Sequence, residues 1–213
     1  MNKIEIEQEF DRQIQTLLNK GYPDAANISL AEFNVHIGPL KEKVLSLELQ
    51  EIDIEQGKLP FVLVVKSELL PAEKAMRLVT RDTKEGITKL DPHHAQDFEV
   101  IESVQIPSQN IYLLVDIDRG KHTLNVRPED ALKIIVSLNR SPLTIDEGIA
   151  IITHFPEFLI KNNCFSLLAS RHSGNQCVPA IWINANKNPN LGWCWDRNPH
   201  TWLGSASCHS RVI

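Results

Sequence analysis

The sequence has no apolar run long enough to cross a membrane. Its longest runs, such as FVLVV at residues 61–65, fall far short of the ~20 residues that a spanning helix needs. Acidic side chains occur within the first ten residues, where a secretory signal would have an apolar stretch. We therefore expect a cytoplasmic protein that makes no contact with a membrane.

Basic charge is also scarce, because 22 Lys and Arg side chains stand against 27 Asp and Glu, a net charge of −5. Nucleic-acid binders normally present a basic surface, so this balance argues against a nucleic-acid partner. Five common motifs are missing as well, namely the Walker loop, G-x-G-x-x-G, H-E-x-x-H, G-x-S-x-G and C-x-x-C. Their absence argues against nucleotide-binding, metalloprotease, α/β-hydrolase and zinc-finger functions.

The four cysteines are separated by 13, 17 and 14 positions, a spacing that matches no compact zinc motif. Two interpretations stay open: ligands that converge on a metal from separate strands, or small apolar side chains in the core. A third hypothesis makes one cysteine a nucleophile, with His200 as its base. We predict no metal site, and the sequence indicates no particular cofactor. The residues concerned are Cys164, Cys177, Cys194 and Cys208, of which Cys194 and Cys208 are the candidate nucleophiles.

A chain of 213 residues can bury roughly 70% of its unfolded surface, enough for a core without disulfides or metal. We expect a single α+β domain, residues 1–213, with N-terminal helices packed on a mixed or antiparallel sheet. It should contain a helical arm at 1–50, a mixed α/β part at 59–160 and a β-rich, Trp- and Cys-rich part at 162–207.

Helical periodicity and capping signals locate the first helices. Apolar residues at helical spacing predict a helix over residues 4–20. A second helix should begin at Ser29, which forms a capping-box pattern with Glu32. Gly38-Pro39 should break or kink it, since proline lacks the backbone donor that a helix needs.

Further along, the short β-branched runs at 61–66 and 111–117 are typical of buried strands. Additional helices should begin at Pro128 and at Thr144, which forms a second capping-box pattern with Glu147.

The last third is predicted to be mainly strands. Residues 164–171 and 177–183 should form a hairpin around the turn HSGNQ, and 191–195 should form a third strand. If the turn centres on Ser173-Gly174, Ser166 and Ile181 share a face of the hairpin.

Charge is distributed unevenly along the chain. Residues 151–213 contain two of the 27 acidic and five of the 22 basic side chains, a net of +3, which leaves −8 for residues 1–150. All four Trp, all four Cys and eight of the fifteen Asn lie in this last segment. A segment so poor in charge is either deeply buried or lines a binding site.

The densest group of unusual residues lies at 191–207, where three Trp, an Asp-Arg pair and Asn-Pro-His precede a run of small residues. One interpretation is a pocket wall, in which indole faces contact an apolar group of the ligand and polar side chains act as directional hydrogen-bond donors and acceptors. The other is a core plug in which these side chains satisfy one another. The candidate ligand-binding residues are Trp193, Trp195, Asp196, Asn198, His200, Trp202, Ser205, Ser207 and Arg171.

Two other groups could hold a metal by composition. Asp116 and Asp118 could bind a hard cation at the end of a strand, but their Asp-Arg-Gly context favours an ordinary strand exit. His93-His94 lies between two aspartates, but in a proline-marked stretch that is more typical of a solvated loop.

Several segments resemble a family of uncharacterised bacterial proteins, a domain of unknown function that is widespread in Gram-positive lineages. The similarity runs over about 59–207 and implies no activity. His93-His94 and Cys208 fall outside its patterns. The matching segments are YLLVDIDRG (112–120), NVRPEDAL (125–132), SPLTIDEGIA (141–150), HFPEFL (154–159), NNCFSLLASR (162–171), VPAIWI (178–183) and GWCWDRNPHTWLGSAS (192–207), with weaker matches at LPFVLVV (59–65) and LLPAEKAM (69–76).

Three functional hypotheses follow. The first is a binding module that holds a small polar ligand or a peptide on the C-terminal Trp/Asn/His/Ser face. The second is a hydrolase or transferase with His200 as acid or base near Ser205, Ser207 or Asp196. The third is a structural or regulatory protein whose acidic N-terminal helices contact another chain.

Overall fold

The computed structural model describes residues 1–213. Its helices are α1 (Lys3–Asn19), α2 (Tyr22–Ala25), α3 (Leu30–Leu45), α4 (Ala72–Leu78), α5 (Pro128–Ser137) and α6 (Ile145–His154), with 3₁₀ turns η1 (Ala95–Asp97), η2 (Lys121–Thr123) and η3 (Pro156–Phe158). Its strands are β1 (Lys58–Val65), β2 (Thr80–Arg81), β3 (Lys84–Glu85), β4 (Ile87–Thr88), β5 (Phe98–Val100), β6 (Ile111–Asp118), β7 (Ser141–Pro142), β8 (Cys164–Ser166), β9 (Ser170–His172), β10 (Cys177–Ile183), β11 (Pro189–Trp195), β12 (Leu203–Ser205) and β13 (Ser207–Val212).

Two sheets organise these strands. The first has the order β1-β6-β13-β7 and is antiparallel throughout. The second has the order β12-β8-β10-β11-β4 and is mixed, because β12 and β4 join their neighbours in parallel. Two short ladders, β2-β3 and β5-β9, lie outside them. The α+β class with a β-rich C-terminal part is confirmed.

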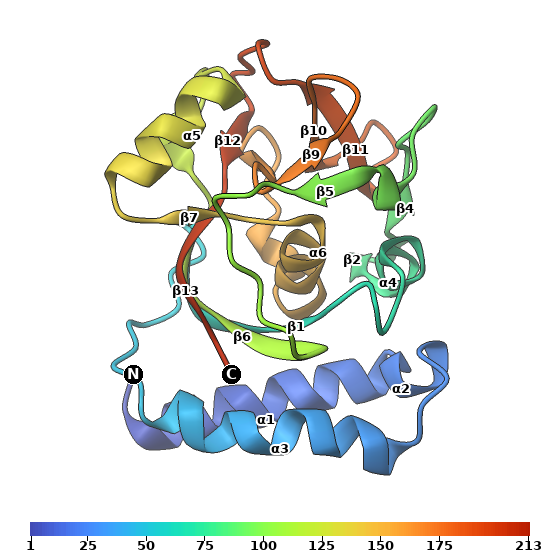
Figure 1. Ribbon diagram of the computed structural model, residues 1–213. Helices are drawn as coiled ribbons and strands as arrows, with labels where there is room; N and C mark the ends of the chain where they lie inside the picture. The colour runs from blue at the N-terminus through green and yellow to red at the C-terminus, as the bar shows by residue number, and fades with distance from the viewer.

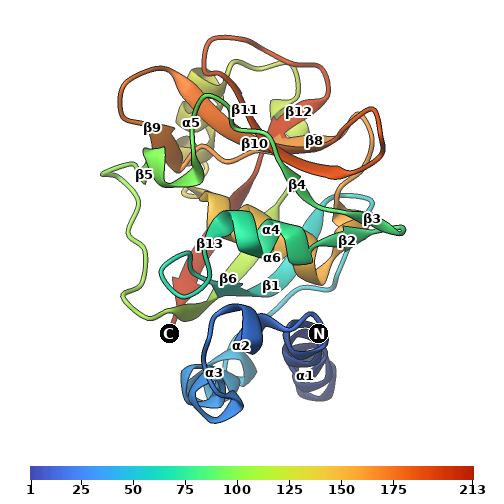
Figure 2. The ribbon, with the colours of Figure 1, turned by 90° about the vertical axis from the view of Figure 1, so that its right-hand side faces the viewer.

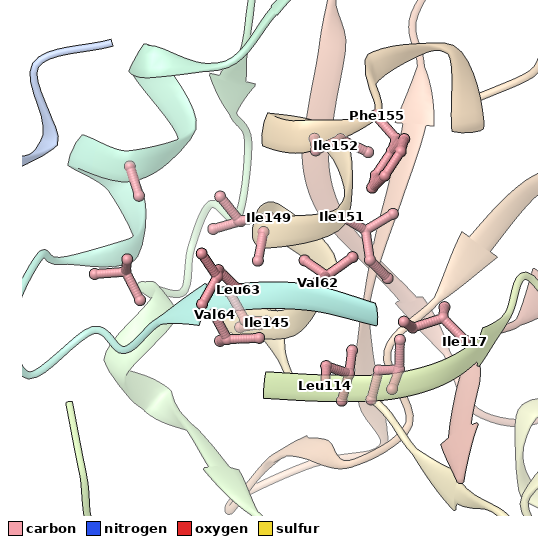
Figure 3. Close-up of a cluster of buried hydrophobic side chains, with 14 of the residues drawn as sticks. Val62, Leu63, Val64, Leu114, Ile117, Ile145, Ile149, Ile151, Ile152 and Phe155 are labelled. Atoms are coloured by element: carbon pink, nitrogen blue, oxygen red, sulfur yellow. The ribbon is translucent and has the colours of Figure 1, made fainter. Parts of the chain in front are cut away.

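The four-stranded sheet is covered on both faces. Helices α1 and α3 lie side by side against one face, and α6, with α4 beside it, lies against the other (Figures 1 and 2). The five-stranded sheet lies beyond α6. This double coverage explains why residues 59–65 of β1 are buried without the alternation of a half-exposed strand. Figure 3 shows a cluster of buried aliphatic side chains from β1, β6 and α6.

Both predicted capping boxes are present. Ser29 with Glu32 begins α3, and Thr144 with Glu147 begins α6. None of the helices has both the length and the apolar character to span a membrane.

Of the break or kink predicted at Gly38-Pro39, the break does not occur, because α3 continues through both residues to Leu45. Proline cannot bind the carbonyl four residues earlier, which belongs to Val35. Both Pro39 and Val35 lie on the exposed face of the helix, and Val35 is 74% exposed. Water can therefore satisfy the carbonyl that Pro39 leaves free.

The predicted C-terminal hairpin is correct in its pairing but not in its length. Strand β8 pairs antiparallel with β10, and Phe165 lies opposite Ile181. A turn centred on Ser173-Gly174 would place Ser166 opposite Ile181, so the observed register differs from it by one residue. The first strand stops at Ser166, because the side chains of residues 167–169 turn into the core and Ala169 N donates to Leu143 O instead. Its continuation, β9, pairs with β5.

Candidate functional site

A cleft of about 530 Å³ lies between three segments that are far apart in the sequence. They are the loop from β1 into α4, the η1–β5 segment and the beginning of α6. This volume is within the roughly 300–1,000 Å³ typical of small-molecule sites.

Asp146 is the most unusual polar group in this cleft. The Thr144 cap begins α6, so that Asp146 falls in the first turn of the helix. Its Oδ2 accepts hydrogen bonds from Ser67 N at 2.9 Å and Ser67 Oγ at 3.1 Å, and its Oδ1 makes none. Burial raises the pKa of the Asp146 carboxyl from 3.8 to about 6, in spite of the bonds from Ser67. Asp146 is therefore an acidic group with one unpaired oxygen at a cleft.

The next residue, Glu147, has the opposite character. Its carboxylate is fully buried and pairs with Arg211 at 2.5 and 2.9 Å. It also accepts hydrogen bonds from Tyr112 OH at 2.7 Å and from Thr144 N at 2.8 Å. Burial and the adjacent Glu147 charge raise the pKa of Tyr112 well above its usual value. Glu147 is thus saturated and fixes the position of Tyr112, which lines the cleft.

The remaining lining is partly apolar, and its charged side chains are mainly acidic. Phe98 and Ile106 contribute apolar surface. The charged side chains are four acidic residues and one lysine, and that lysine already bonds to a backbone carbonyl and pairs with one of the acids. They are Glu68, Glu73, Glu99, Asp146 and Lys66. The electrostatic potential of this lining favours a cation over an anion.

One cluster beside the cleft has the side chains of a metal site. The ligand atoms of His93, Asp97 and His172 all lie within 4.8 Å of one another. The η1–β5 segment joins the two features, since Ala95 and Phe98 line the cleft while Asp97 belongs to the cluster. The histidine-rich stretch is therefore not simply a solvated loop.

The nine residues predicted from the sequence do not converge on this cleft, and none of them lines it. Trp193 and Trp195 form an edge-to-face pair at 5.2 Å. Trp193 is half-buried, and its Nε1 donates to the backbone carbonyls of Leu90 and Asp91 at 3.1 and 3.2 Å. Trp195 is exposed.

Two charged members of the predicted set pair with each other. Arg171 Nη1 lies 3.3 Å from Asp196 Oδ2. Asn198, which is exposed, donates its backbone N–H to Trp195 O at 3.1 Å.

A further group surrounds His200. Its ring lies 5.3 Å from that of Trp202, which packs edge-to-face on Trp182 at 6.0 Å. His200 Nε2 is buried without a hydrogen-bond partner, and burial lowers the pKa of this side chain.

The two predicted serines are buried, and each bonds to the side chain of a different residue. Thr123 Oγ1 accepts the backbone N–H of Ser205 at 2.8 Å, and Ser207 Oγ accepts from Arg140 Nε at 2.9 Å. No hydrogen bond joins either serine to His200.

The two aspartates of the strand end are each neutralised by a different cation. Asp116 pairs with Arg140 at 2.8 Å, and Asp118 pairs with Lys58 and accepts from Gly120 N at 2.7 Å. This geometry fits the strand-exit interpretation.

All four cysteines are free thiols. Burial raises the pKa of Cys194 to about 11 and that of Cys208 to about 12, which disfavours the thiolate that a nucleophile needs.

Sequence reasoning missed Ser67, Tyr112 and Asp146. A signal for Asp146 existed, because the Thr144–Glu147 capping box places the intervening acid in the first turn of a helix. No local signal indicates that Ser67 reaches the same place.

Comparisons with known proteins extend the resemblance seen in the motifs. The model of a family described as "Family of unknown function (DUF5701)" matches residues 16–213. The match includes α2, α3 and the last turn of α1, and so reaches further than the similarity over 59–207. No curated protein and no solved structure matches the chain. The chain belongs to the DUF5701 family of unknown function.

Proposed function

We propose that this protein binds a small organic cation, an amine carried on an apolar body, in the cleft at the beginning of α6. The observation that carries the proposal is the Asp146 carboxylate, with one oxygen held by Ser67 and the other unpaired. The proposal keeps the hypothesis of a binding module for a small polar ligand, and moves the site from the C-terminal Trp face to this cleft.

Charge supports a cationic ligand. A carboxylate with a pKa of about 6 is mostly ionised at neutral pH, although burial disfavours the ionised form. An ammonium group that donates to Asp146 Oδ1 would compensate this charge, in a type of hydrogen bond about twice as strong as one between neutral groups. The other acidic side chains of the lining add to the attraction.

Apolar surface supports a ligand with a hydrophobic body. Phe98 and Ile106 lie in the same lining as Asp146, and a cation near an aromatic face gains about 0.5–2 kcal/mol. Tyr112 is fixed by Glu147, so this wall is organised before a ligand enters.

The test is a thermal-shift and calorimetric screen of primary amines with aliphatic or aromatic bodies at pH 7.5, with the corresponding alcohols as neutral controls. The amines should raise the Tm of the wild type, and the alcohols should not. A ligand at a hundred times its Kd stabilises by about 2.7 kcal/mol, which such a screen detects.

Asp146→Asn should abolish the response to amines. Asp130→Asn is the matched control, since Asp130 also lies in the first turn of a helix, α5, but outside the cleft. Equal responses to amines and alcohols, or an unchanged response in Asp146→Asn, would overturn the proposal.

A further inference from the structure

The loop that carries His93 and the strand that carries His172 meet because β5 and β9 pair. Their ladder places Phe98 opposite His172, so that the residue before Phe98, Asp97, lies next to the histidine. On the other side, the Trp193 indole holds the loop through its bonds to the Leu90 and Asp91 carbonyls. Two segments distant in the sequence are thereby fixed around one small space.

From this arrangement we propose that His93, Asp97 and His172 bind a divalent transition-metal ion of the Zn²⁺ or Co²⁺ class. Two imidazoles and one carboxylate are a ligand set typical of zinc, iron, cobalt and nickel sites rather than of Mg²⁺ or Ca²⁺. The inference does not depend on the amine proposed for the cleft.

The distances are compatible with three ligands after small side-chain rotations. The three ligand atoms lie within 4.8 Å of one another, and ligand atoms on a tetrahedral zinc ion are about 3.3 Å apart at the usual bond lengths. The His93 and His172 rings already lie 4.1 Å apart, centroid to centroid. All three side chains are half-buried, so solvent can supply the remaining ligand.

The surroundings restrict how the two rings can turn. The Phe98 ring stands edge-on to both imidazoles, at 6.0 Å from His93 and 5.7 Å from His172. Trp193 stands edge-on to His93 at 5.6 Å. Aromatic neighbours of this kind hold ligand side chains in place and keep the local dielectric low, which strengthens metal binding.

The turn at residues 173–175 also contacts both rings. Gly174 N donates to His172 Nδ1 at 3.0 Å, and Asn175 Nδ2 lies 3.3 Å from His93 Nε2. A metal ion bound to His172 Nδ1 or to His93 Nε2 takes the place of the contact with the turn. A metal ion bound to the other nitrogen of either ring moves the ring proton onto the contacting nitrogen, which can then no longer accept a hydrogen bond. In both cases metal binding displaces the 173–175 turn.

Cys177 lies behind this cluster, with its Sγ 3.8 Å from His93 Nε2. It is fully buried and is not among the three residues whose ligand atoms all lie within 4.8 Å of one another.

The test is a titration of chelator-treated protein with Co²⁺ alone, followed by the visible absorption of the bound ion and by competition with Zn²⁺. One equivalent should bind. Because loss of a group that merely supports a ligand costs about 10–100-fold in affinity, His93→Ala and His172→Ala should each weaken binding at least tenfold. Hydrogen exchange at residues 173–175 should change on loading.

His94→Ala is the matched control, since His94 is the exposed neighbour of His93 and lies outside the cluster. Its affinity should equal that of the wild type, and circular dichroism should show that all variants are folded. Binding that is equal in His93→Ala and the wild type, or that is lost in His94→Ala, would overturn the proposal. Because no organic ligand is used, failure here leaves the amine proposal to its own test.

Discussion

Replacing Asp146 by Asn should raise the free energy of unfolding near pH 8, although it removes the group on which ligand binding is proposed to depend. Burial raises the pKa of Asp146 from 3.8 to about 6 in the folded protein. One pKa unit corresponds to 1.36 kcal/mol, so a shift of this size makes the ionised side chain cost about 3 kcal/mol at high pH. Solvent at the cleft screens part of this cost.

The expected net gain is smaller than this cost. The amide oxygen of Asn can still accept both hydrogen bonds that Ser67 donates to Oδ2, but these bonds lose their charge-assisted character. A gain of about 1–2 kcal/mol near pH 8 therefore remains. The gain should shrink as the pH falls from about 6 to 4, because the folded wild type takes up a proton in that range and Asp146 becomes neutral, like Asn.

Urea unfolding followed by Trp fluorescence at pH 8 and pH 5 measures this difference. Asp130→Asn is again the control, because hydrogen bonds from Lys133 and Arg127 hold the pKa of Asp130 below its usual value. That variant should gain no stability at either pH. If Asp146→Asn is no more stable than the wild type at pH 8, or if its advantage is the same at pH 5, burial does not destabilise the ionised Asp146 in the folded protein.

Four other outcomes are expected in urea unfolding. Gly120→Ala should lower the free energy of unfolding by about 2–4 kcal/mol, because Gly120 has φ +83 and the new Cβ would lie 2.1 Å from the Ser205 carbonyl oxygen. Gly38→Ala should raise the free energy of unfolding by up to about 1 kcal/mol, because the position is helical and no atom lies within 4 Å of the new Cβ. Arg211→Met should cost about 3–5 kcal/mol, since it leaves the buried Glu147 charge without its cation. Far-UV circular dichroism and Trp fluorescence should report one coincident transition, as expected if residues 1–213 fold as a single domain; two separated transitions would contradict this.

Local signals predicted the helix and strand positions well. The capping boxes at Ser29 and Thr144 act within one helical turn, so their sequence pattern is sufficient. The break expected at Pro39 does not occur, because the effect of a proline depends on which face of α3 meets the sheet. That face is a property of the tertiary structure.

The candidate site was harder to predict because it is not local. Asp146 becomes unusual only when Ser67 bonds to it and Phe98 joins it in the lining of one cleft, and neither residue is near it in the sequence. The composition of residues 151–213 indicated a site in that segment instead, because low charge is typical of both a binding pocket and a core. Ser205 and Ser207 are buried in the structure, and burial in the core accounts for much of the low charge of the segment without a ligand.

A crystal structure with the best-binding amine would show whether the cleft at the beginning of α6 binds an organic cation through Asp146. We expect density in the cleft with the amine nitrogen within hydrogen-bond distance of Asp146 Oδ1. Density for the amine beside Trp202 and His200, with the cleft filled only by water, would contradict it.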